Sequence, residues 1–309
     1  MNILVTGGCG YKGSVLVPKL LAKGHKVTVV DIMWFGNFLS PHKNLHVIKA
    51  DIRDIQPAWF SEVEAIIHLA SVANDPCCEL DPKLTWEVGA LATMQLAEQA
   101  IKHGIKQLIY ASSGSVYGVS DLLQVTEETP LNPISEYNKA KMVTERVLLS
   151  YANELAIKIV RPATVCGYSP RMRLYVSVNM LTMQALTKGV ITVFGGDQTR
   201  PNINIDDITD LYLFLLENNV SGIFNAGFEN LSILDIANDV TSSINAEIKV
   251  TASNDPRSYR INSDKLLKIG FKPKKCVKDA IKELIEYYKQ GDLKDEDCFY
   301  NIRTMKKLA

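Results

Sequence analysis

The sequence predicts an α/β fold with a doubly wound parallel sheet and a smaller cap built mainly from its C-terminal part. Three observations lead to this prediction. In the first half, short apolar runs rich in valine and isoleucine alternate with stretches of helical periodicity. The first apolar run ends at a glycine-rich turn that opens a helix. After about residue 165 the alternation breaks up, and proline, glycine and asparagine separate shorter segments.

The expected strands of the first half are short and apolar. They cover residues 2–6, 26–31, 45–50, 65–70, 107–112 and 157–161. Three helices are expected between them, and the first two end at a glycine. These helices cover residues 11–23, 82–103 and 136–154. Right-handed crossovers between parallel strands then place helices on both faces of the sheet.

The second part of the chain is expected to supply the cap. Its candidate helices cover residues 176–188, 206–218, 234–244 and 276–288, and residues 291–297 form a charged stretch expected to be a solvated linker. We therefore expect residues 1–167 to form a nucleotide-binding domain. Residues 168–309 would form mainly a substrate-binding cap, with some segments returning to the sheet.

The composition excludes several classes of protein. The chain has 309 residues, of which 34 are Lys or Arg and 34 are Asp or Glu, so its formal net charge is zero. This balance argues against binding to nucleic acid, which needs an excess of positive charge. No apolar run approaches the ~18 residues of a membrane span, and the first residues predict a strand rather than a signal peptide. We expect no membrane partner.

The six cysteines are spread along the chain without a C-x-x-C pair. In a chain of this length without an export signal, they are expected to be free thiols in the cytoplasm. Cys77 and Cys78 are adjacent and cannot readily ligate one metal ion together. No metal site is predicted.

Three glycines between the first strand and the first helix indicate a nucleotide-binding loop. Gly7, Gly10 and Gly13 form a G-x-x-G-x-x-G pattern. Glycine there permits a tight turn and close approach to a pyrophosphate, which the free N–H groups at the helix start then bind. Asp31 ends the second strand, where a carboxylate can accept from both ribose hydroxyls and would repel a 2′-phosphate. Together these features predict a Rossmann-type fold that binds NAD rather than NADP.

Two further strand ends carry candidates for the same site, because ligands bind at the carboxyl ends of parallel strands. Asp51 follows the third strand and could accept a hydrogen bond from an adenine amino group. Residues 68–71 lie at the carboxyl end of the fourth strand, and His68 among them is expected to be a packed structural side chain. Lys12 is a candidate phosphate ligand, although an exposed helix lysine is the simpler interpretation.

Ordered motifs along nearly the whole chain resemble those of the extended short-chain dehydrogenases/reductases. Besides the glycine loop, the strongest matches are Ser-Ser-Gly-Ser-Val-Tyr-Gly at residues 112–118 and Tyr-Asn-Lys-Ala-Lys at residues 137–141. Further matching segments lie within residues 161–167, 195–207 and 255–273. The branch that the chain resembles is that of the NAD-dependent nucleotide-sugar epimerases and dehydratases, and in particular its UDP-glucose 4-epimerase-like members.

Tyr137, Lys141 and Ser113 form the candidate catalytic group. Tyr137 and Lys141 are four residues apart in an expected helix, so they share one face. A nearby ammonium and the positive nicotinamide of oxidised NAD would lower the pKa of Tyr137 from its usual value near ~10. Tyr137 could then remove a proton from a sugar hydroxyl while hydride leaves the same carbon. Ser113 ends the fifth strand and could hydrogen-bond the same oxygen.

The resemblance implies roles for further residues. The residues implied to bind the cofactor are Gly7, Gly10, Tyr11, Lys12, Gly13, Asp31, Asp51, Ile52, Leu69, Ala70, Ser71, Tyr137 and Lys141. Those implied to bind a UDP-, GDP- or dTDP-linked sugar are Ser113, Ser115, Thr164, Asn179, Arg200 and Arg257. Residues 82–103 and 136–154 resemble the helices that pair across a homodimer interface, so a homodimer is expected.

Three departures from the family pattern refine the prediction. Where the family's 4,6-dehydratases carry an Asp-Glu pair, this chain has Gly114 and Ser115, which cannot ionise, so 4,6-dehydration is not expected. Gly89 stands where the family has an asparagine that supports the active-site helix. Residues 161–173 resemble a subgroup that includes GDP-manno-heptose 4-dehydrogenases, and within them Arg171 and Arg173 could add charge around a sugar or phosphate.

The favoured function is an NAD-dependent nucleotide-sugar 4-epimerase that oxidises C4 and then returns the hydride. The alternative within the same chemistry is a 4-dehydrogenase, acting on a GDP-heptose-like substrate, that releases the 4-keto sugar. A non-catalytic NAD-binding sensor or scaffold is the alternative of another class. It would be expected to lose Tyr137 or Lys141, and both are present.

Overall fold

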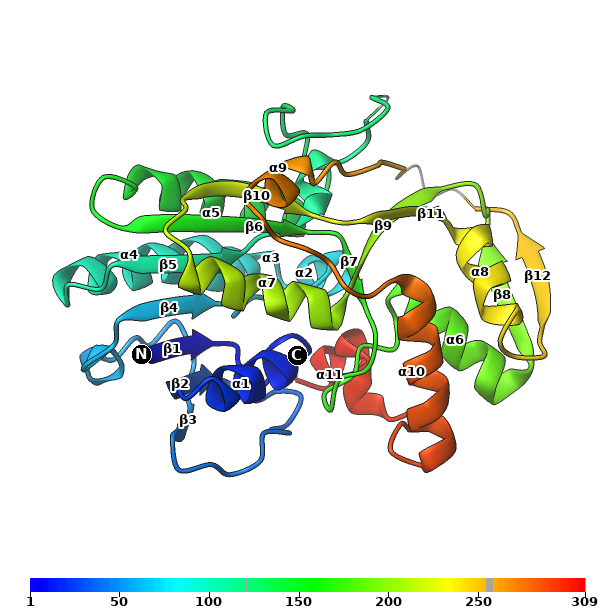
Figure 1. The fold of residues 1–309 in the computed structure, drawn as a ribbon, viewed down its shortest axis with the longest axis horizontal. Coiled ribbons are helices and arrows are strands. Elements are labelled where there is room, and N and C mark those ends of the chain that lie inside the picture. The colour runs from blue at the N-terminus through cyan, green and yellow to red at the C-terminus, as the bar shows by residue number, and fades with distance from the viewer. Residues whose placement is uncertain (121, 254–257, 309) are drawn as a thin grey trace.

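The fold is built around a seven-stranded parallel sheet (Figure 1). The computed structural model describes residues 1–120, 122–253 and 258–308. The strand order is β10-β6-β5-β4-β1-β2-β3, and all six neighbouring pairs are parallel. The strands are β1 (Asn2–Thr6), β2 (Lys26–Asp31), β3 (Leu45–Lys49), β4 (Ala65–His68), β5 (Gln107–Ala111), β6 (Ala156–Pro162) and β10 (Gly222–Ala226). The order reverses between β1 and β4, and such a switch point opens a crevice at the carboxyl ends of the strands.

Helices cover both faces of this sheet (Figure 1). One face carries α1 (Gly13–Ala22) and α7 (Ile205–Glu217). The other face carries α3 (Pro82–Trp86), a π-helical turn (Glu87–Leu91), α4 (Ala92–Lys102) and α5 (Glu136–Ser150), while α2 (Asp75–Leu80) packs against α5. The single helix expected over residues 82–103 is therefore interrupted by a π-turn, a feature that occurs often at functional sites.

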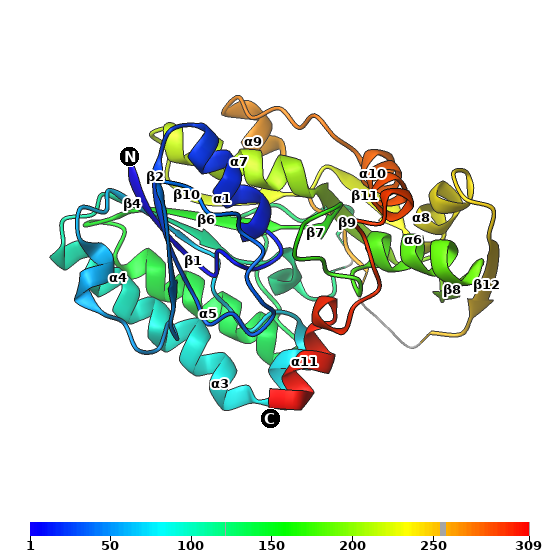
Figure 2. The same ribbon diagram turned by 90° about the horizontal axis from the view of Figure 1, so that it is seen from below.

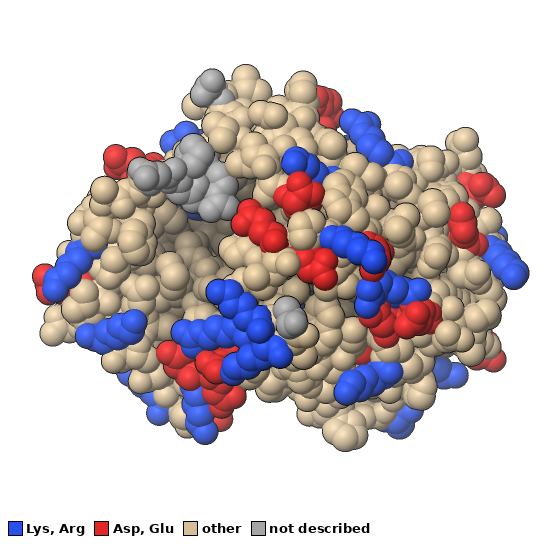
Figure 3. All heavy atoms as spheres, turned by 180° about the vertical axis from the view of Figure 1, so that it is seen from behind, with Lys and Arg blue, Asp and Glu red and all other residues tan. Residues whose placement is uncertain are grey.

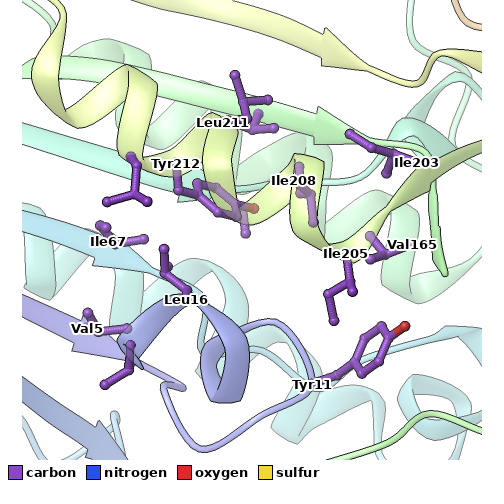
Figure 4. Packing of buried hydrophobic residues seen from close by; sticks show 14 of the residues in the cluster. Val5, Tyr11, Leu16, Ile67, Val165, Ile203, Ile205, Ile208, Leu211 and Tyr212 are labelled. Atoms are coloured by element: carbon purple, nitrogen blue, oxygen red, sulfur yellow. The ribbon is translucent and has the colours of Figure 1, made fainter. Parts of the chain in front are cut away.

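The core of the sheet domain draws on segments far apart in the sequence (Figure 4). Leu16 of α1 faces Tyr212 of α7, and both pack against Val5 and Ile67 of the sheet. Each of these four side chains is buried. Although residues 206–218 were expected as a cap helix, they form α7 on the sheet domain, and β10 follows as its edge strand. The chain thus returns to the sheet after its first excursion into the cap.

The cap lies beside the carboxyl ends of the sheet (Figure 1). It contains the sheet β11-β9-β7 and the pair β12-β8. Its elements are β7 (Thr164–Cys166), α6 (Ser177–Lys188), β8 (Val190–Phe194), β9 (Thr199–Asn204), β11 (Glu229–Ser232), α8 (Ile233–Thr241), β12 (Glu247–Thr251) and α10 (Val277–Gln290). A separate buried cluster joins α6, α8 and α10 through residues such as Leu181, Ile236 and Ile281.

The chain ends with α11 (Asn301–Leu308), which sequence patterns did not predict. It leaves the cap and packs against α2 of the sheet domain (Figure 2). The remaining short elements are α9 (Asp264–Lys268) and 3-10 turns at Pro57–Phe60, Gly114–Tyr117 and Asp297–Phe299. The residues between α10 and the last of these turns include Leu293, which is only 2% exposed, so the expected solvated linker is anchored in the core.

Charged side chains of both signs are interspersed on the face shown in Figure 3. Near the chain's end, Asp297 pairs with both Arg303 and Lys307. Exposed pairs of this kind contribute little to stability. Their mixture agrees with the zero net charge of the chain.

Candidate active site

A pocket lies at the switch point of the sheet and extends toward the cap. Of the residues that the resemblance implied to bind the cofactor or the sugar, sixteen line it, and so do Arg171 and Arg173. The sixteen are Gly7, Gly10, Tyr11, Lys12, Gly13, Asp31, Asp51, Ile52, Leu69, Ala70, Ser71, Ser113, Ser115, Tyr137, Thr164 and Arg200. Lys141 and Asn179 do not line the pocket. Arg257 lies outside the described residues.

The glycine loop has no room for side chains. Gly7 has φ +70°, and a Cβ there would lie 2.6 Å from the backbone nitrogen of Ala70. A Cβ on Gly13 would lie 2.3 Å from the carbonyl oxygen of Gly8. The loop therefore stays close to both β4 and the start of α1. This cradle fits a dinucleotide pyrophosphate.

Asp31 is held in place by the backbone around it. The N–H of Cys9 donates to Oδ2 at 2.9 Å, and the N–H of Met33 donates to Oδ1 at 2.7 Å. Burial raises the pKa of Asp31, against the opposing effects of these two bonds and of the charge of Arg171. Each carboxylate oxygen keeps a further lone pair that a ribose hydroxyl can use.

Asp51 lines the pocket but already has a cationic partner. Arg53 donates to its Oδ2 from Nη2 at 2.8 Å and from Nε at 3.1 Å, and Arg53 also pairs with Glu87 at 2.7 Å. Burial opposes the charged form, but Arg53 lowers the pKa of Asp51 overall. An adenine amino group would share this carboxylate with Arg53.

Lys12 is not the exposed lysine that the helix pattern favoured. It lines the pocket, and its Nζ lies 3.4 Å from the hydroxyl of Tyr212. Burial lowers the pKa of Lys12 to about 7, and the charges of Lys141 and Arg173 add to this. No acidic group among the described residues acts on the pKa of Lys12, so an anion in the pocket would favour its charged form.

Tyr137 belongs to a row of hydroxyl groups at the centre of the pocket. Ser113 lines the same pocket and acts to lower the pKa of Tyr137, against the effect of burial. The Oγ atoms of Ser113 and Ser115 are 2.7 Å apart, and Ser115 donates to Oδ1 of Asn138 at 2.6 Å. Since Oδ1 only accepts, Ser115 must receive its bond from Ser113. The oxygen of Ser113 also accepts from the backbone N–H of Ser115 at 3.2 Å, which leaves it one lone pair for a hydroxyl in the pocket.

Lys141 lies one helical turn behind Tyr137 and is 4% exposed. Its Nζ donates to the carbonyl of Ala111 at 2.8 Å and lies 5.9 Å from the ring centroid of Tyr137. It also lies 4.7 Å from the ring centroid of Tyr110. Burial lowers the pKa of Lys141 to about 8, although Cys78 and Glu145 act in the opposite direction.

The pKa of Tyr137 moves opposite to the expectation from the sequence. Burial raises it, and among the protein's own groups the main charge that lowers it is Arg173 rather than Lys141. Arg173 lines the pocket and donates from Nε to the hydroxyl of Tyr175 at 2.8 Å. The i, i+4 spacing therefore placed Lys141 on the helix face of Tyr137, but it did not identify Arg173, the cation that lowers the pKa of Tyr137 most.

A buried ion pair fixes α5 against the sheet. Arg161 of β6 and Glu145 of α5 are 2.6 Å apart, with side chains only 3% and 2% exposed. Ser112 donates to the same carboxylate at 2.5 Å. Removing one member of such a pair leaves the other as an unpaired buried charge, which strongly destabilises the fold. The pair thus positions the helix that carries Tyr137 and Lys141.

Gly114 and Gly89, which depart from the family pattern, differ in how much free space surrounds them. At Gly114 an added Cβ would lie 2.5 Å from Cδ1 of Ile261 and 3.1 Å from the carbonyl oxygen of Pro162. An acidic side chain has no space there without movement. At Gly89 a Cβ would meet only Ala140 at 3.5 Å and Thr144 at 3.8 Å, which are ordinary contacts on α5.

Asn179 is a structural residue in this fold. It is fully buried, accepts from the N–H of Gly167 at 3.0 Å and donates to the hydroxyl of Tyr11 at 3.1 Å. Tyr11 in turn donates to the carbonyl of Gly167 at 2.7 Å. Because its amide is used in fixing Tyr11, Asn179 does not reach a phosphate in the pocket.

His68 is the packed side chain that the sequence predicted. It lies between Thr6 at 2.6 Å and Thr93 at 2.8 Å and is fully buried. Thr93 donates to the carbonyl of Gly89, so it accepts from Nε2 of His68, and Nδ1 accepts from Thr6. Burial lowers the pKa of His68 to about 3, and the charge of Lys141 adds to this.

Sequence reasoning missed several pocket residues. Trp34 and Phe35 follow Asp31, and their place after the second strand could have indicated them. Asn301 comes from α11, and no local pattern connects it with the pocket. Among the described residues there is no group of three potential metal-ligating side chains.

Comparisons with known proteins show the family of the chain. The profile of the "NAD dependent epimerase/dehydratase family" matches residues 3–227. The chain belongs to this family. It is therefore an NAD-dependent enzyme of nucleotide-sugar metabolism, and the tight glycine loop and Asp31 fit the cofactor. Within the described residues, no helix is both long and apolar enough to cross a membrane.

Relatives carry more than one activity. UDP-glucuronic acid decarboxylase 1 of Xenopus tropicalis is 29% identical, over 94% of this chain and 72% of that protein. A putative UDP-glucose 4-epimerase of Methanocaldococcus jannaschii is 29% identical, over 94% of this chain and 99% of that protein. The solved UDP-glucose 4-epimerase of Thermotoga maritima, with UDP-glucose, superposes with a TM-score of 0.85 at 28% identity, covering 94% and 99% of the two chains.

Proposed function

We propose that the protein is a nucleotide-sugar 4-epimerase, which oxidises C4 of the sugar and returns the hydride to the opposite face of the same carbon. One observation carries the proposal: Tyr137 and Ser113 line the same pocket, while the neighbouring positions 114 and 115 hold a glycine and a serine, neither of which can act as an acid or base. C4 redox chemistry needs the first arrangement, and dehydration needs an ionisable acid and base beside it, which Gly114 and Ser115 do not supply.

The proposed roles follow from the contacts. Bound NAD supplies the hydride acceptor and donor. Tyr137 takes the proton of the C4 hydroxyl and later gives it back, while Arg173 favours its charged form. Ser113 accepts from a hydroxyl in the pocket because its own hydrogen is directed toward Ser115. Lys141 holds the end of β5 through the carbonyl of Ala111.

The substrate side is proposed to consist of Ser115, Thr164 and Arg200, which line the pocket. A guanidinium such as that of Arg200 suits the oxygens of a diphosphate. Arg257 has the same proposed role from the resemblance, but it lies outside the described residues. The names of the relatives make UDP-sugars the first substrates to examine, ahead of GDP- and dTDP-sugars.

The second candidate is a 4-dehydrogenase that releases the 4-keto sugar. It is favoured by the segment of residues 161–173, which resembles that of GDP-manno-heptose 4-dehydrogenases and places Arg171 and Arg173 at the pocket. The two candidates share the C4 oxidation. They differ in whether the reduced cofactor stays bound and returns its hydride.

We also propose a homodimer formed by α4 and α5, from the family resemblance. Leu91, the last residue of the π-turn before α4, is 54% exposed, which suits an interface between two copies. Light scattering during size-exclusion chromatography would give the mass. A monomer at micromolar concentration would contradict the proposal.

The function is tested by product analysis. The purified protein is incubated with NAD and with UDP-, GDP- or dTDP-linked hexoses and heptoses, and products are examined by mass spectrometry and NMR. A 4-epimer has unchanged mass and an inverted C4 proton coupling, whereas a 4-keto product lacks two hydrogens and appears with stoichiometric reduced cofactor. Loss of a water molecule would overturn the assignment. NAD binding without turnover of any of these sugars would favour a sensor or scaffold.

A further inference from the structure

The guanidinium of Arg171 is buried beside the cofactor pocket. The residue is 2% exposed and lines the pocket with Asp31 and Phe35. Its carbon Cζ lies 4.2 Å from the ring centroid of Phe35, so the planar group stacks on the segment that follows β2. The charge is therefore held next to the carboxylate expected to bind the adenosine ribose.

Only neutral oxygens accept hydrogen bonds from Arg171 among the described residues. Nη1 donates to the carbonyl of Met172 at 3.1 Å, and Nη2 donates to Oδ1 of Asn301. Nε has no hydrogen-bond partner in the described part of the chain. A buried N–H without an acceptor is costly, and burial of the charge lowers the pKa of Arg171 to about 10. A bound ligand oxygen would relieve both effects.

Asn301 is delivered to this place by the C-terminal segment, residues 297–308. The carbonyl of Phe299 accepts from the N–H of Leu174 at 3.1 Å, and the ring of Phe299 packs on Phe38, with centroids 6.0 Å apart. Met305 of α11 is buried in the cluster of the sheet domain. Figure 2 shows α11 beside the helices at the edge of that domain, so the segment spans from cap to sheet.

We propose that Arg171 and Asn301 form a subsite for the adenosine half of NAD, with the C-terminal segment acting as a strap across it. Nε–H of Arg171 donates to an oxygen of the adenosine ribose or its adjoining phosphate. Asn301 fixes the guanidinium for this contact, since its Oδ1 accepts from Nη2. Release of the cofactor then requires the strap to loosen or the buried charge to lose its ligand.

This subsite has a consequence for the proposed 4-epimerase, on which this step rests. An epimerase must keep its reduced cofactor until the hydride returns, whereas a dehydrogenase exchanges it after each oxidation. A strap that spans two parts of the molecule slows exchange. The subsite itself concerns NAD binding, so it holds whichever of the two reactions follows.

The test measures NAD binding without any sugar. Asn301→Ala and Arg171→Met are compared with Lys306→Ala, an exposed position on the same helix. Calorimetry is expected to show NAD affinity lowered about tenfold or more in the first two variants and unchanged in the control. Stopped-flow fluorescence should show faster release of the reduced cofactor. Thermal melts without cofactor establish that each variant is folded.

Further outcomes decide against the subsite. Wild-type affinity and release rate in folded Asn301→Ala and Arg171→Met would overturn it. Equal weakening in the Lys306→Ala control would also overturn it, because the effect would then belong to the helix in general. Amide hydrogen exchange in α11 that NAD leaves unchanged would contradict the strap. The product analysis above can fail while these binding results stand, so the two proposals fail separately.

Discussion

Asp31 is the residue on which cofactor choice depends. Two backbone N–H groups orient its carboxylate at the pocket. We expect NAD to bind about tenfold or more tightly than NADP, a difference of about 1.4 kcal/mol or more. Asp31→Ala removes the ribose bonds and the repulsion of a 2′-phosphate, so the ratio of affinities should fall toward one. Calorimetry with both cofactors checks this, and equal affinity in the unaltered protein would contradict the ribose role.

Tyr137 is the proposed acid and base. Tyr137→Phe keeps the ring and removes the hydroxyl, so turnover should fall by the ~10²–10⁴ that a general base contributes. NAD affinity should change little, because the glycine loop and Asp31 are untouched. Steady-state rates and calorimetry on the same preparation test both statements. A variant that retains full turnover would assign the base to another residue.

Arg173 should set the pH dependence of the reaction. Burial raises the pKa of Tyr137, and Arg173 lowers it, so removing the guanidinium leaves that pKa higher. In Arg173→Met the acidic limb of the kcat/KM profile, on which Tyr137 is still protonated, should therefore move to higher pH, and turnover at lower pH should be slower. Arg173→Lys should restore much of the profile. A larger shift in Lys141→Met than in Arg173→Met would show that the lysine is the dominant cation.

Residue-level prediction from sequence was most successful where the motif was contiguous. The glycine loop and the serines at 113 and 115 reach the pocket because short segments at strand ends determine their positions. Asn179 was misplaced because its amide bonds to Tyr11, 168 residues away, and no local pattern contains that contact. Lys12 was misjudged since Tyr212, which lies over it, comes from α7.

At the scale of elements, the π-turn offers a direct test. Gly89 lies in it with ordinary spacing to Ala140 and Thr144. Alanine has a higher helix propensity than glycine, so Gly89→Ala should raise the free energy of unfolding by about 0.5–1 kcal/mol. Urea titration followed by circular dichroism measures the change. A destabilised variant would show that the π geometry itself requires glycine.

Helices and strands could be predicted where the spacing of apolar residues and the turn residues at the ends of the segment indicated the same element. The strands Asn2–Thr6 and Lys26–Asp31 have the expected bounds, since each is a valine-rich run closed by a turn. β10 was missed because five residues between glycine-rich turns carry too short a pattern. α11 was missed because its position depends on contacts with α2 and with Arg171, which are remote in the sequence.

For the whole molecule, His68 should make stability sensitive to acid. Its folded-state pKa of about 3 lies below the 6.5 of the unfolded chain, so the unfolded state binds the proton first. The stability that the neutral ring contributes is complete above pH 6.5 and is lost as the pH falls from 6.5 toward 3. The slope approaches about 1.4 kcal/mol per pH unit.

Denaturant unfolding at several pH values checks this expectation. His68→Gln should have a shallower loss of stability between pH 6.5 and 4 than the unaltered protein, although its stability at neutral pH is lower. His46→Gln is the control, because that side chain is exposed on β3. Parallel curves for all three proteins would mean that His68 is not the group that titrates.

The return of the chain to its first domain has a consequence during synthesis. Val5, Leu16 and Ile67 leave the ribosome early, but α7 and β10 that complete their surroundings follow much later. Until then one face of the growing sheet lacks part of its cover, and exposed apolar surface of this kind recruits chaperones. Nascent chains stalled before residue 205 should therefore be held by chaperones and cut readily by protease. Chains that have released β10 should resist both.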